Sequence, residues 1–327
     1  MFIKKSKKLL KKINVIILSN NLNELHYVKE ILENTPIKNL VLKKIYENKF
    51  NLNTEYTSLW NQNFKQTVNL LNIHKINYTL IKYINLPEIY MKDIDLLIEK
   101  KDDIRKLILE LRKLNFNIYT KNEFKTVDKY LAFGFFNNRL KVEIDIYPKP
   151  SWWMIRYASD QQITLNKTSK IINGQTVFIP SPTHELYIIA THSFWHGTIT
   201  LAEVTYIYYI IKNNNIKWDD LIELAERYHL KHAVYIYLRL VKEIFTLQHI
   251  KNDDLNKTLT YFSTNYLCYS IWNALKKSNN NFPLNISFIY KIISALDEIF
   301  RGLGKGKLFY GEFESYLTAL LFGRRKG

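Results

Sequence analysis

Asp93 and Asp95 stand one residue apart, at the start of the mostly apolar run 94–98. A short apolar run of this kind predicts a buried strand. Successive side chains of a strand point to opposite faces, so the two carboxylates point to the same face, with their Cβ atoms roughly 6–7 Å apart. Two ionised carboxylates that close repel each other. A divalent cation between them removes the repulsion, and hard oxygen ligands suit Mg²⁺.

Carboxylates recur on a second candidate strand, residues 141–147. Its residues alternate strictly, with Val142, Ile144 and Ile146 on one face and Glu143, Asp145 and Tyr147 on the other. If this strand lies beside the first, about 4.8 Å away, Glu143 or Asp145 joins the aspartate pair. Three carboxylates on neighbouring strands could hold one or two Mg²⁺ ions against a triphosphate, as in two-metal catalysis of in-line displacement. The alternative for Asp-x-Asp alone is a solvated strand edge, because the pattern is common on surfaces.

A third strand-like run, 77–83, ends in Lys82-Tyr83 and is followed by the turn-rich link 85–88. This order of elements resembles the nucleotidyltransferase superfamily of DNA polymerase β type, and more narrowly the family of uncharacterised nucleotidyltransferases. Members of that family carry a hydrophobic strand ending in Lys-Gly, then Asp-Ile-Asp-Leu-Leu-Val, then a Val-Asp/Glu-Leu-His strand. The matching pieces here are Leu80-Ile81-Lys82-Tyr83, Asp93-Ile94-Asp95-Leu96-Leu97-Ile98 and Val142-Glu143-Ile144-Asp145. Residues 218–225 are similar to the family's Asp-Trp-x-x-Leu-x-x-Leu-Ala segment, so the resemblance extends roughly over residues 55–240.

The resemblance implies a nucleotidyltransferase that uses Mg²⁺, or Mn²⁺ in its place, to move a nucleoside monophosphate from a nucleoside triphosphate to a hydroxyl group. Asp93 and Asp95 would bind the metal. Asp145 or Glu143 would complete the metal site and deprotonate the attacking hydroxyl. Lys82 would offset phosphate charge, and Tyr83 would lie beside the nucleotide.

One departure from the family pattern leaves a second hypothesis open. Tyr83 stands where the family has glycine, next to backbone amides that grip phosphate. The alternative is therefore a catalytically inactive protein of the same fold that binds nucleotide or RNA. For the enzyme, the acceptor could be RNA such as tRNA, a protein or a small molecule. The preferred nucleotide, with ATP among the candidates, and the oligomeric state do not follow from the sequence.

Composition restricts the class of protein. The chain has 327 residues, 47% hydrophobic and 14% aromatic, which predicts a folded chain with two domains. Its formal net charge of +17 favours polyanionic partners such as nucleic acid or nucleotide phosphates. Cys268 is the single cysteine, which excludes a disulfide framework within one chain and fits a cytoplasmic protein. No run approaches the roughly 18 apolar residues of a membrane span, so no membrane association is expected.

Three parts of the chain are predicted, and the overall class is α/β (α+β). Residues 1–54 form a basic, helical segment. Residues 55–180 form a small mixed α/β sheet with helices at 55–74 and 101–114, strands at 116–119 and 130–136, an Asn137-Asn138 turn, and a hairpin at 170–179 that turns at Asn173-Gly174. Residues 181–327 form an all-α domain that begins with Thr183 as N-cap and supplies the other wall of the cleft.

Six helices are expected in the last part, at 186–195, 201–211, 218–228, 233–245, 255–275 and 288–299. His192 and His196 share a face of the first, but Ser193 stands where a zinc protease has glutamate. We therefore expect a structural pair, or contacts to substrate phosphate, rather than a zinc site. Glu203 is the expected packing partner of His192. The Gly- and Lys-rich stretch 302–307 lacks the order of a phosphate-binding P-loop and predicts a basic loop.

Overall fold

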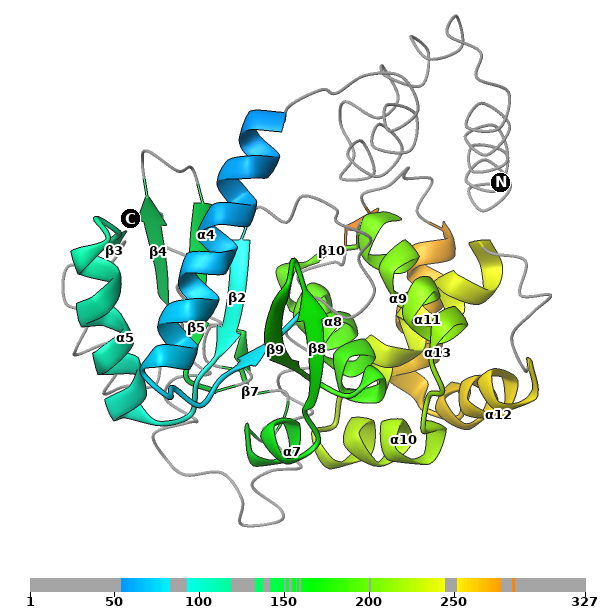
Figure 1. Ribbon diagram of the computed structural model, residues 1–327. Coiled ribbons are helices and arrows are strands. Elements are labelled where there is room, and N and C mark those ends of the chain that lie inside the picture. The colour runs from blue at the N-terminus through cyan, green and yellow to red at the C-terminus, as the bar shows by residue number, and fades with distance from the viewer. Residues whose placement is uncertain are drawn as a thin grey trace, which may run out of the picture. The chain divides into compact units, whose positions relative to one another are not determined.

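The computed structural model describes residues 54–82, 93–118, 133–137, 142–149, 151–152, 155–156, 158, 160–199, 201–244, 252–277 and 284–285 (Figure 1). These residues belong to two compact units, one with residues 54–82 and 93–188 and one with residues 189–285. Several predicted features lie outside the described residues. They are the segment 1–53, Tyr83, residue Asn138 of the expected turn, the expected helix at 288–299 and the loop 302–307.

A mixed sheet organises the first unit. Its five strands lie in the order β1-β2-β5-β4-β3. Their bounds are β1 Thr79–Leu80, β2 Asp93–Leu97, β3 Asn117–Ile118, β4 Phe133–Asn137 and β5 Val142–Tyr147. The central pair, β2 and β5, is parallel, and the other neighbours are antiparallel. The expected small mixed sheet is therefore confirmed.

Two helices, α4 (Thr54–Ile73) and α5 (Lys101–Lys113), build the core of this unit with the sheet (Figure 1). The apolar residues of α5 recur at helical spacing and are fully buried: Ile104, Leu107, Ile108 and Leu111. They share one cluster with Ile94 and Leu96 of β2 and Ile144 and Ile146 of β5. Because strand residues alternate, the residues between these, Asp95 and Asp145 among them, point to the other face.

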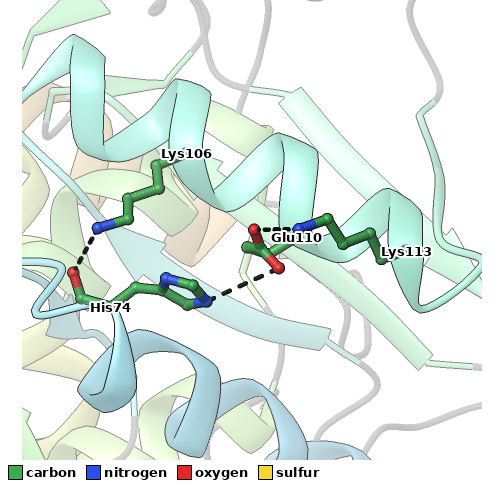
Figure 2. A network of polar contacts seen from close by, with 4 residues as sticks. All are labelled: His74, Lys106, Glu110 and Lys113. Carbon is green, nitrogen blue, oxygen red and sulfur yellow. Dashed lines mark hydrogen bonds and ion pairs between the residues drawn. The ribbon is translucent and has the colours of Figure 1, made fainter.

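A polar network joins the end of α4 to α5 on the helical side of the sheet. Figure 2 shows Lys106 Nζ donating to the His74 carbonyl at 3.0 Å and Lys113 Nζ donating to Glu110 at 2.7 Å, with His74 Nε2 3.7 Å from Glu110 Oε2. The hydrogen bond from Lys113 is the main cause that lowers the pKa of the Glu110 carboxyl. Contacts to side chains as exposed as Lys113 contribute little stability.

A hairpin, β8 (Thr168–Ile172) and β9 (Gln175–Ile179), packs against the same core. Its turn residues Asn173 and Gly174 have φ angles of 49° and 74°, the left-handed geometry that an Asn-Gly hairpin turn requires. Asn173 Nδ2 donates to Asn61 Oδ1 of α4 at 2.7 Å. Val177 and Ile179 join the core cluster. The predicted hairpin and its turn are confirmed. The short strands β6 (Ser151–Trp152) and β7 (Ile155–Arg156) and helix α7 (Asp160–Leu165) lie between β5 and the hairpin in sequence.

The C-terminal region is helical, as predicted. Its helices are α8 Pro182–His196, α9 Leu201–Asn213, α10 Trp218–Arg227, α11 Lys231–Ile244, α12 Asn252–Ser263 and α13 Tyr266–Lys277. The described part of this region also contains two short strands, β10 (Thr198–Ile199) and β11 (Leu284–Asn285), which pair antiparallel over two residues. Over the described part of the chain, no helix has both the length and the apolar character that a membrane crossing requires.

Two of the differences from the predicted helix bounds are explained by side-chain caps. Helix α8 begins at Pro182 and is capped by Ser181, whose hydroxyl accepts from the His184 amide at 3.4 Å; Thr183 lies inside the helix. The single helix expected over 255–275 is two helices, because the Asn265 side chain accepts from the Leu267 amide at 2.9 Å and starts α13. In both cases a short polar side chain that competes for backbone amides decides the boundary.

Candidate active site

The register between β2 and β5 brings four acidic positions onto one face of the sheet. Asp93 pairs with Glu143 and Asp95 pairs with Asp145 across the parallel ladder. Residues paired in this way project to the same face, on strands about 4.8 Å apart. The side chains of Glu143 and Asp145 are partly exposed, whereas Asp95 is buried; the Asp93 side chain lies outside the described atoms. Both candidates for the third carboxylate thus stand beside an aspartate of β2.

Gly134 of β4 is the neighbour of Asp145 on the other side. Directly opposed residues of an antiparallel pair share a face, so a residue without a side chain adjoins Asp145 on the acidic face. A glycine inside a strand often marks close approach by another group. The sequence prediction missed this position, although a lone glycine in a strand-like run was a signal that could have indicated it.

An ion pair occupies the centre of the candidate site. Lys82 Nζ donates to Asp95 Oδ1 at 2.8 Å, and the side chains are 19% and 3% exposed. Charge-assisted hydrogen bonds of this length are among the stronger polar contacts in proteins. The Ile81 amide donates to the Asp95 carbonyl at 3.1 Å, which extends the pairing of β1 with β2 by one residue. The structure therefore brings together Lys82 and Asp95, which the sequence predicted for the same site.

The backbone of Lys82 explains how its side chain reaches Asp95. Ile81 is opposite Asp95, so in a regular strand Lys82 would point to the other face, where Ile94 lies. Lys82 instead has a φ angle of 68°, in the left-handed region that residues other than glycine rarely adopt. The alternation ends there, and Lys82 Nζ lies 5.7 Å from the centre of the Tyr147 ring, on the acidic face.

The donor chemistry of this face fits a hard divalent cation. Aspartate and glutamate oxygens are preferred ligands of Mg²⁺ and Mn²⁺. Among the side chains that the structure describes, which do not include Asp93, no three His, Cys, Asp or Glu lie close enough together to hold a metal ion. The residues that could hold one are Asp93, Asp95 and Asp145, with Glu143 as the alternative, by the register of their strands.

Comparison with protein-family models matches residues 83–246 to a family described as uncharacterised nucleotidyltransferase. This chain belongs to the uncharacterised nucleotidyltransferases. The matched span covers half of the chain and includes β2, β5 and helices α8–α11. It begins one residue after Lys82, so the case for Lys82 rests on its geometry. No curated protein and no solved structure matches the chain.

The helices of the C-terminal region contain a second, partly buried polar cluster. Tyr237 Oη of α11 donates to Glu203 Oε2 of α9 at 3.2 Å, and Tyr237 also shares a hydrogen bond with Ser193 of α8. Burial, followed by the nearby Glu203 charge, raises the pKa of the Tyr237 hydroxyl well above its usual value. Glu203 is therefore a helix-packing residue with Tyr237 as one partner. Its predicted contact with His192, which is buried in α8, stays a prediction, and the His196 side chain lies outside the described atoms.

Proposed function

We propose that this protein is a Mg²⁺-dependent nucleotidyltransferase that moves a nucleoside monophosphate from a nucleoside triphosphate to a hydroxyl acceptor. The observation that carries the proposal is the register of β2 with β5, which pairs Asp93 with Glu143 and Asp95 with Asp145 on the face opposite the α4/α5 core. Like charges are not gathered on one face of a sheet without a stabilising counter-charge. Membership of the family supports the same reaction class.

Each residue has a distinct role in this proposal. Asp93 and Asp95 would hold the metal, and Asp145 or Glu143 would complete its ligands. A bound divalent cation would supply Lewis-acid stabilisation of the phosphate charge. Asp145 or Glu143 would take the proton from the acceptor hydroxyl as its oxygen forms a bond to the α-phosphorus. The bond from that phosphorus to pyrophosphate breaks, and pyrophosphate leaves with the bonding electrons. Lys82, with Tyr83 next to it, would face the phosphates and offset their charge.

The acceptor is tested without assuming its class. Purified protein is incubated with each α-³²P-labelled nucleoside triphosphate, Mg²⁺ or Mn²⁺, and a total cell lysate, beside an Asp93→Ala/Asp95→Ala variant. We expect a labelled product that the variant does not form. The size and nuclease sensitivity of the product separate RNA, including tRNA, from protein and from small molecules. A variant that transfers label as fast as the wild type contradicts the assignment of the aspartates.

The third carboxylate is assigned by comparing two isosteric variants, Asp145→Asn and Glu143→Gln. Replacing the residue that binds metal and takes the proton should lower the turnover about 10²-fold or more. Replacing the other residue should lower it much less. Far-UV circular dichroism checks that both variants fold. If labelling fails with every nucleotide while RNA binds in a salt-sensitive way that Asp95→Asn does not change, the protein is a binding module of the same fold.

A further inference from the structure

We infer that Lys82 is an internal counter-ion for the metal ligand Asp95, held in the position that a divalent cation takes over. Metal binding would release the ammonium from Asp95 and make it available to the nucleotide phosphates. The inference rests on the proposed function, because it assigns Asp95 to the metal. It goes further by giving Lys82 two alternating partners and by making metal binding the event that changes them.

Three observations indicate that the position of Lys82 favours its contact with Asp95. The Nζ–Oδ1 distance is 2.8 Å, and the Asp95 side chain is only 3% exposed, so solvent cannot replace the ammonium as a counter-charge. The φ angle of 68° turns the lysine out of the strand pattern and onto the acidic face. The Tyr147 ring, 5.7 Å from Nζ, provides a second favourable surface for the cation. A left-handed lysine that reaches a buried carboxylate indicates a position built for that contact.

The same contact opposes metal binding. An ammonium 2.8 Å from Asp95 Oδ1 and a divalent cation on the same oxygen would repel each other strongly in a buried site. Lys82 and the metal therefore compete for Asp95. The Lys82 side chain is 19% exposed, so its flexible stem has solvent on one side into which the ammonium can move. The apparent affinity for metal alone is reduced by this competition, and nucleotide phosphates, which offer Lys82 a new partner, would restore it.

Two experiments without nucleotide test the inference, so neither depends on activity. In the first, binding of Mn²⁺ alone is measured by the loss of the free-ion electron paramagnetic resonance signal. Lys82→Met should bind Mn²⁺ about tenfold more tightly than the wild type, a difference of about 1.4 kcal/mol. Lys82→Arg, which keeps the cation, should bind as weakly as the wild type. Lys65→Met, which removes an exposed lysine of α4, is the matched control for the loss of one charge and should leave the affinity unchanged.

The second experiment uses the wild-type protein, so it holds even if Lys82→Met does not fold. Amine acetylation at Lys82 and Lys65 is followed by mass spectrometry as Mn²⁺ is added. We expect the Lys82 rate to rise severalfold as the ammonium leaves Asp95, whereas the Lys65 rate stays constant. A Lys82 rate that does not rise, or an unchanged Mn²⁺ affinity in Lys82→Met, overturns the inference. If Mn²⁺ does not bind, or binds equally to Asp95→Asn, the proposed metal site itself fails, and the inference fails with it.

Discussion

The Lys82–Asp95 ion pair predicts that removing the lysine destabilises the protein more than removing the aspartate. Lys82→Met leaves a carboxylate that is 3% exposed, with Asp145 as its neighbour across the ladder. Breaking a buried pair in this way costs roughly 3–5 kcal/mol. Asp95→Asn leaves an ammonium that is 19% exposed and can turn to solvent. We expect it to cost about 1 kcal/mol, the net value of one hydrogen bond.

The assay is urea unfolding followed by far-UV circular dichroism, in buffer with a chelator so that metal cannot replace the lost ammonium. The expected difference between the two variants is about 2–4 kcal/mol, which is large against typical stabilities of 5–15 kcal/mol. The double variant Lys82→Met/Asp95→Asn should be more stable than Lys82→Met alone, because the buried charge is gone. Lys65→Met again controls for the loss of one exposed lysine.

An Asp95→Asn variant that is destabilised as much as Lys82→Met, or more, would contradict this expectation. That result would mean that the Asp95 carboxylate gains another counter-charge or contact with solvent when Lys82 is removed. The burial of Asp95 would then not determine how much the loss of Lys82 destabilises the protein. A double variant as unstable as the sum of the two single variants would show that the residues do not interact in solution.

Three further predictions concern other parts of the fold. Burial raises the pKa of the Cys268 thiol to about 12, so labelling with a maleimide at pH 7.5 should be slow in the folded protein and fast in denaturant; fast labelling of folded protein contradicts this. Asn265→Ala should lower the free energy of unfolding by about 1 kcal/mol because α13 loses its cap, and urea unfolding that matches the wild type would contradict the cap assignment. Gly174→Ala should lower the free energy of unfolding by about 1 kcal/mol in the same assay. The cost comes from the φ angle of 74° alone, since an added Cβ meets nothing within 4 Å. A neutral or stabilising change contradicts this prediction.

The two central strands were predictable, β5 from its strict alternation and β2 from its short apolar run. Asp93 and Asp95 share a face, as do Glu143 and Asp145, whatever the arrangement of the strands. The pairing of Asp95 with Asp145 was not predictable, since a shift of two residues preserves both faces and their hydrophobic pattern. Register depends on the whole packed sheet, and the alternation in either strand alone does not contain it.

Local backbone choices were harder to predict. Nothing in the run 77–83 indicates that Lys82 adopts a left-handed conformation, because lysine has no intrinsic preference for it. Ser181 and Thr183 are both good N-caps. The proline between them is the one signal that favours Ser181, because proline is common at the first position of a helix. The apolar spacing over 255–275 continues through Asn265, so hydrophobic period alone merges α12 with α13. The helical character of the C-terminal region was predictable because it depends on spacing and not on boundaries.

The parallel pairing of β2 with β5 has a consequence for how the chain folds. Parallel neighbours require a long crossover, and here α5, β3 and β4 all lie between the two strands in sequence. The ladder therefore closes a large loop, which is slow, and it brings like charges together in the same step. Lys82 lies just after β1, which joins β2 by a much shorter connection, so its ammonium can reach Asp95 before β5 arrives. The order of chain closure thus favours neutralising the first carboxylate strand before the second one docks beside it.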